Sequence, residues 1–130
     1  MMNDCVLKSP ISSAILTFYD RDVEYFTVMY ANPSVKLKKR VWGYTDCNLL
    51  IDLFMSIASE WRGWKGIKQW ASIEGDFSIS ATCDSLGHVM LNIILVEFDG
   101  PEPWMSEVQL GLEPSQTDDI AKSIKVFFEN

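Results

Sequence analysis

The chain has 130 residues, 48% of them hydrophobic and 22% charged, which excludes a disordered protein and leaves room for one domain, placed at residues 1–130. Its net charge of −7 originates in residues 71–130, where eleven acidic side chains accompany two basic ones, so nucleic acid is not an expected partner. No apolar run approaches the roughly 20 residues that cross a bilayer, and we therefore expect no membrane partner.

The first third of the chain is rich in β-branched and aromatic residues, which favour strands. Residues 13–19 and 23–30 are two such runs, and the short polar link between them predicts a hairpin. Residues 35–42 then begin by alternating apolar and basic side chains, which is typical of a half-exposed or edge strand. Lysines on such an edge discourage pairing with other chains.

A helix is predicted next, over residues 46–61, with Thr45 or Asp46 supplying an N-cap oxygen and Gly63 as a stop signal. Its apolar stripe has helical spacing and consists of Leu49, Leu50, Leu53, Phe54, Ile57, Ala58 and Trp61.

Three further strands are predicted at 77–82, 88–98 and 104–112, followed by a terminal helix over 115–128. The order βββαβββα with short links indicates an α+β fold, in which one antiparallel sheet of about six strands carries both helices on one face. The residues expected in its core are Leu53, Phe54, Ile57, Ile79, Leu91, Ile93, Ile124 and Phe127.

The cysteines and the N-terminus bear on the compartment. Cys5, Cys47 and Cys83 are odd in number and widely spaced, which makes a poor disulfide framework. The first ten residues lack the basic start and apolar stretch of a signal peptide. We therefore expect a cytoplasmic protein.

Acidic residues cluster around one predicted turn, and this cluster is the candidate partner-binding site. It consists of Glu97, Asp99, Glu102, Trp104 and Glu107, with a glycine and two prolines that stiffen the turn. Opposite charge steers encounter, so an acidic surface suits a basic protein partner. The alternative is that an acidic surface only keeps the protein in solution. The carboxylates lack the ligand periodicity of a calcium loop, and we predict no metal and no cofactor.

Cys83 and His88 flank a predicted four-residue turn and are the strongest candidates for a nucleophile and its base. No third residue is evident to orient the imidazole, and a histidine that opens a strand is usually structural. We therefore predict no catalytic residue and no enzymatic activity.

Three of the five tryptophans lie in W-R-G-W-K-G-I-K-Q-W, from Trp61 to Trp70. One interpretation is a corner that caps the core, with Trp61 ending the helical stripe and Trp64 or Trp70 covering the sheet. The other is a surface anchor, because Trp and Arg are enriched at interface hot spots.

W-R-G-W-K-G, Trp70 and Asp84–Val89 (D-S-L-G-H-V), followed by Pro103-Trp104 and a C-terminal helix, resemble a family of small bacterial proteins of unknown function. The resemblance covers roughly residues 49–128. That family is similar in size and layout to immunity proteins of toxin systems, including the wall-associated-protein immunity group.

The resemblance implies an immunity protein that binds and neutralises the toxin domain of a cognate contact-dependent or secreted effector, such as a basic nuclease. We expect it to be a monomer or a weak dimer. The alternative function is a small-molecule-binding or cryptic enzymatic domain that uses the His88 hairpin and a Trp-lined pocket.

Overall fold

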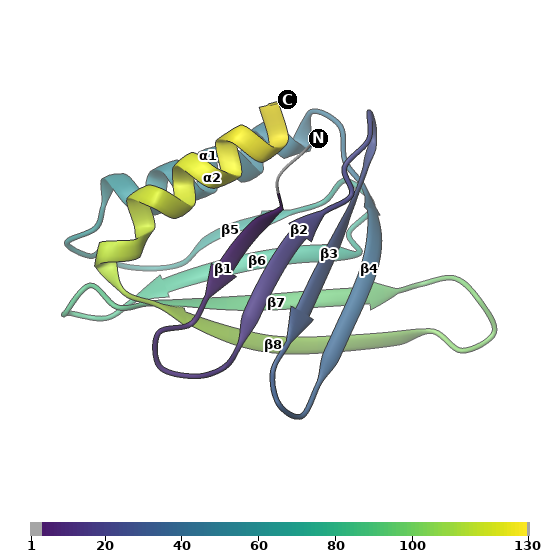
Figure 1. Cartoon of the computed structure of the whole chain (residues 1–130), viewed down its shortest axis with the longest axis horizontal. Helices are drawn as coiled ribbons and strands as arrows, with labels where there is room; N and C mark the ends of the chain where they lie inside the picture. The colour runs from purple at the N-terminus through teal and green to yellow at the C-terminus, as the bar shows by residue number, and fades with distance from the viewer. Residues whose placement is uncertain (1–3, 130) are drawn as a thin grey trace.

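The computed structural model describes residues 4–129 and has the order four strands, helix, four strands, helix (Figure 1). The elements are β1 (Cys5–Lys8), β2 (Ile15–Tyr19), β3 (Tyr25–Ala31), β4 (Lys36–Trp42), α1 (Asp46–Ser59), β5 (Lys68–Ala71), β6 (Phe77–Cys83), β7 (Val89–Glu97), β8 (Trp104–Leu112), a 3-10 turn (Pro114–Gln116) and α2 (Thr117–Glu129). The strands form two antiparallel sheets of four, β1-β2-β3-β4 and β5-β6-β7-β8. The architecture is α+β, and the prediction of one six-stranded sheet is wrong.

The error has two physical causes. Strands β1 and β5 are only four residues long, and neither offers a run of β-branched residues. In addition, each sheet has an apolar face of its own, and the two faces pack against each other, while α2 adds Phe127 and Phe128 to the same core. Phe18 of the first sheet lies 6.0 Å from Phe77 of the second, and Phe26 lies 6.2 Å from the same ring, measured between ring centroids.

The two helices close the side of the molecule where β1 and β5 lie (Figure 1). Helix α1 contacts β5, α2 contacts β1, and the helices contact each other. Helix α1 therefore packs against the sheet that follows it in the chain, and α2 packs against the first sheet and not only beside the one that it directly follows. The predicted core is confirmed in all its members, which are buried: Leu53, Phe54, Ile57, Ile79, Leu91, Ile93, Ile124 and Phe127.

Helix α1 starts at Asp46 as predicted, but its N-terminal capping and its end differ from the sequence prediction. Thr45 is the N-cap but makes no side-chain capping hydrogen bond. Asp46 instead accepts the backbone N–H groups of Tyr44 and Ile73 at 2.6 and 3.1 Å, which ties the helix to the loop after β5. At the other end α1 stops at Ser59, so Trp61 lies outside the helix and is exposed.

Candidate functional site

The Trp-rich segment and D-S-L-G-H-V are distant in sequence and meet in the structure. A Cβ atom added to Gly87, whose φ is +85°, would lie 2.9 Å from the carbonyl oxygen of Trp61. A Cβ atom at Gly63, with φ +117°, would lie 3.5 Å from the carbonyl oxygen of Asp84. Both positions favour glycine because their φ angles are positive, and position 87 also has no space for a Cβ atom. This junction gives both segments a structural role.

Some tryptophans of the Trp61–Trp70 segment cap the core and one is exposed at the surface. Trp70 is buried in β5 and donates its indole N–H to the carbonyl of Asp46 at 2.7 Å, as a core-capping residue would. Trp64 is half-buried against the core. Trp61 is exposed, with the Arg62 guanidinium 4.9 Å from its ring centroid, so this residue does not end a buried stripe.

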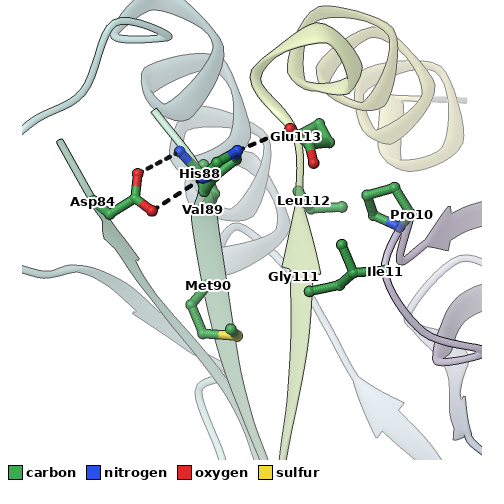
Figure 2. A pocket seen from close by; sticks show the side chains of 9 residues that line it. All are labelled: Pro10, Ile11, Asp84, His88, Val89, Met90, Gly111, Leu112 and Glu113. Carbon is green, nitrogen blue, oxygen red and sulfur yellow. Dashed lines mark hydrogen bonds and ion pairs between the residues drawn. The ribbon is translucent and has the colours of Figure 1, made fainter. Parts of the chain in front are cut away.

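His88 is held between two carboxylates (Figure 2). Its Nδ1 lies 3.1 Å from Asp84 Oδ2, and its Nε2 lies 3.2 Å from Glu113 Oε2. Asp84 also accepts the backbone N–H of His88, and this bond is the main reason that the pKa of the Asp84 carboxyl is below its usual 3.8. The expectation that nothing orients the imidazole is therefore wrong, although the spacing of Asp84 and His88 across a turn was a usable signal.

A hollow of about 260 Å³ lies beside His88, where the β1–β2 loop reaches β8 (Figure 2). Its lining is mainly apolar and consists of Pro10, Ile11, Asp84, His88, Val89, Met90, Gly111, Leu112 and Glu113. Cys83 is not among them, because it lines a different hollow together with Trp64.

Cys83 and His88 also point to opposite faces of the sheet. Cys83 pairs with Val89, whose side chain lies on the buried face of β7. Because side chains alternate along a strand, His88, which precedes Val89, points away from that face. The two candidates for a nucleophile and its base are therefore not brought together. The hollow beside Trp64 is lined by Asp84 and Ser85 of the His88 hairpin, but the His88 side chain faces the other hollow.

The predicted partner-binding residues gather at the β7–β8 hairpin, which projects at the right of Figure 1. Asp99 and Glu102 lie exposed in its turn. Glu97 pairs with Trp104 on the face that is turned toward the first sheet, whereas Glu107 pairs with Ile94 on the opposite face. The five residues thus surround the hairpin and do not form one flat patch.

Two exposed apolar residues of this hairpin were not predicted as part of the site. Phe98 is 61% exposed and Met105 is 66% exposed, next to Trp104 at 38%. Met105 is exposed because it lies on the outer face of the second sheet, and Phe98 is exposed because it lies in the turn beyond the end of β7. Isolated apolar residues at a surface are ordinary, but three around one turn are characteristic of an interaction site.

Because side chains alternate along a strand, the basic residues of β4 lie on both faces of the first sheet. Lys36, Lys38 and Arg40 occupy one face, and Lys39 occupies the other. Lys39 points between the sheets, where its Nζ lies 3.6 Å from Asp76 Oδ2 and 3.2 Å from Glu97 Oε1. One predicted partner-binding residue, Glu97, therefore also joins the two sheets.

Residues 4–129 hold no group of three or more His, Cys, Asp or Glu side chains arranged to bind a metal. No helix among them is long and apolar enough to span a membrane.

Residues 8–130 match a protein family described as a family of unknown function (DUF6228). The match begins well before residue 49, so it also includes strands β2, β3 and β4, which lie outside the range of the sequence resemblance. No curated protein and no solved structure matches the chain. Nothing in these comparisons links the family to toxin immunity.

Proposed function

We propose that this chain, which belongs to the family of unknown function DUF6228, is a cytoplasmic immunity protein that binds and neutralises the toxin domain of a cognate effector. The observation that carries the proposal is the projecting β7–β8 hairpin, where the exposed apolar side chains of Phe98, Trp104 and Met105 stand among carboxylates. A binding protein of this kind needs a rigid scaffold and a few aromatic anchors, and no chemistry of its own.

The chemistry of the hairpin favours a basic partner. Asp99 and Glu102 are exposed and have no ion pair among the described residues, so their charges are free to attract cations. Long-range attraction accelerates encounter, and an indole such as that of Trp104 then contributes contact area that slows dissociation. A toxin with a basic substrate groove, such as a nuclease, matches both features.

The second candidate function is a small-molecule site in the hollow beside His88. The observation in its favour is an apolar lining with an imidazole and two carboxylates at its rim. Both imidazole nitrogens already contact carboxylates, however, so neither is free to serve as a base without a rearrangement. We rank this function below partner binding for that reason.

The test uses the effector domain encoded immediately upstream of this chain's gene, because immunity genes follow their toxins. Co-expression of the chain should restore growth to cells that produce this domain, and the purified proteins should form a complex. Cys83→Ser and His88→Ala should protect as well as the wild type. Loss of protection in His88→Ala, with an unchanged melting temperature, would favour the second candidate. The same loss in Cys83→Ser would overturn the prediction that this thiol has no functional role. Absence of both protection and binding by the wild type would refute the proposal.

A further inference from the structure

The hydrogen-bonding direction of β7 determines which backbone groups of β8 are free. The N–H of Val96 donates to the carbonyl of Asp76 at 2.8 Å, so the backbone groups of Val96 point toward β6. In an antiparallel ladder the direction alternates from residue to residue, and the backbone groups of Glu97 therefore point toward β8. Glu97 pairs with Trp104, which makes Trp104, Ser106 and Val108 the residues that bond to β7.

Met105, Glu107 and Gln109 consequently direct their backbone groups to the other side, where the sheet ends. A second observation supports this assignment independently, because the hydroxyl of Tyr30 donates to the carbonyl of Gln109 at 3.0 Å from outside the sheet. Within residues 4–129, no strand pairs with β8 on that side.

Only part of this edge is accessible. Gln109 is capped by Tyr30, and Gly111 lies under Ile11, whose Cδ1 is 3.3 Å from the position of a Cβ atom added to that glycine. Met105 and Glu107 lie nearer the hairpin turn, and their side chains are exposed. Neither backbone receives a hydrogen bond from outside the sheet among the described residues.

We propose that the toxin partner adds an extended segment to the β8 edge at Met105–Glu107, so that its backbone continues the second sheet. This inference rests on the proposed function and names the surface and the binding mode. Strand addition obtains affinity from main-chain hydrogen bonds and specificity from alternate side chains.

The side chains around the edge define the segment that fits. Glu107 is exposed and lies on the outer face, where it accepts a hydrogen bond from Asn92 at 2.7 Å. A Lys or Arg directly opposite Glu107 would gain a cross-strand ion pair, and an apolar residue two positions away would lie opposite Met105. The occupant is therefore an extended segment with a basic and an apolar residue at alternate positions. A second copy of this chain fits less well, since it would bring another acidic strand to Glu107.

The test is a proline at an outward-facing N–H. Glu107→Pro leaves the bonds to β7 in place, because proline is tolerated on an edge strand where the N–H faces outward. The ring nevertheless removes a donor and obstructs the approaching strand, so the Kd for the upstream effector domain should rise by about tenfold to a hundredfold. Lys38→Pro is the matched control, since its N–H faces outward on β4, and its Kd should equal that of the wild type.

Two more variants separate a loss of the backbone N–H from misfolding and from a loss of charge. Met105→Pro repeats it at the neighbouring free N–H, in case Glu107→Pro does not fold by circular dichroism. Glu107→Thr keeps the backbone N–H and removes the charge, and it should raise the Kd for the effector domain less than Glu107→Pro does. If the folded proline variants bind with wild-type affinity, strand addition at the β8 edge is wrong but the proposed function stands. If the wild type does not bind the effector domain, the proposed function is wrong as well. A wild-type dimer that Glu107→Pro dissociates would identify a second copy as the occupant and overturn the assignment to the toxin.

Discussion

Strands β4 and β8 are the last strands of their sheets, and each leaves one edge unpaired. The residues of β4 whose backbone groups face its open edge are Lys36, Lys38 and Arg40, with Trp42 at the end. Their counterparts on β8 are Met105, Glu107, Gln109 and Gly111, of which the last two are covered. One edge is thus lined with cations, and the other offers an exposed methionine and a single carboxylate.

The difference shows that two topologically equivalent edges carry different chemistry. Consecutive cations on an edge strand repel a like strand and discourage aggregation. Arg40 is further engaged by Asp22, with 2.8 Å between Nη2 and Oδ2, which ties the β4 edge to the β2–β3 turn. The β8 edge has no such protection beside the hairpin turn, so it is the edge that remains available for a partner.

The largest effect is expected inside the first sheet, where Lys39 differs from its neighbours. Lys39→Met keeps the apolar stem but leaves the nearly buried Asp76 without a counter-ion, which should lower the free energy of unfolding by about 3 kcal/mol. Lys38→Met, on the outer face, should change it by no more than about 0.5 kcal/mol. Urea denaturation of both variants measures the difference; equal stabilities would mean that the alternation along β4 is assigned wrongly.

The next effect concerns the anchor of the hairpin. Trp104→Ala should accelerate dissociation of the toxin complex, at a cost of about 2 kcal/mol or more if the indole is a hot spot. Trp42→Ala, next to the β4 edge, serves as the matched substitution and should leave dissociation unchanged. Surface-binding kinetics with the upstream effector domain distinguish the two. Unchanged dissociation in Trp104→Ala, or faster dissociation in Trp42→Ala, would move the interface toward β4.

A smaller effect is expected from charge in the hairpin turn. Asp99→Lys combined with Glu102→Lys should slow association about tenfold at low salt, because steering depends on exposed charge. Added salt should slow the wild type toward the variant, since exposed charges are screened beyond about 8–10 Å at physiological ionic strength. Stopped-flow association rates over a salt series provide the check. Association that does not depend on salt would contradict an electrostatic role for this turn.

The smallest effect concerns the link between β4 and the β2–β3 turn. The backbone N–H groups of Glu24 and Tyr25 donate to Asp22, and with a lesser contribution from Arg40 they lower the pKa of its carboxyl below 3.8. Because the folded-state pKa is lowered, the stabilisation is present above the unfolded pKa and is lost as the pH falls through the folded value. Arg40→Gln should raise the pKa of the Asp22 carboxyl only part of the way back to 3.8, and an NMR titration of Asp22 measures this change. A complete return to 3.8 would assign the effect to the ion pair instead.

Local patterns predicted most of the elements, and non-local packing explains what they missed. The spacing of Leu53, Phe54 and Ile57 predicted the buried side of α1, because helical periodicity is a local property. The sequence could not indicate that two apolar sheet faces would pack against each other, since Phe18 and Phe77 lie far apart in the chain. Strand β5 was missed because a four-residue K-Q-W-A segment has no strand signal of its own.

The candidate site was predicted as a cluster in sequence, and the register decides how it is arranged. Glu97 and Glu107 are close along the hairpin but lie on opposite faces of the sheet, and Glu97 also contacts Lys39. Strand alternation could have indicated this division once the register was known. The free backbone groups at Met105 and Glu107 carry no side-chain signature at all, because an open edge is a property of the assembled sheet.

The most direct test of the account is residue-resolved amide hydrogen exchange of the free chain and of its complex with the upstream effector domain. We predict that exchange at the N–H groups of Met105 and Glu107 slows by at least about tenfold on binding, while exchange at Lys36 and Lys38 is unchanged. Unchanged exchange at Met105 and Glu107 in a fully formed complex, with new protection at Lys36 and Lys38, would contradict the account.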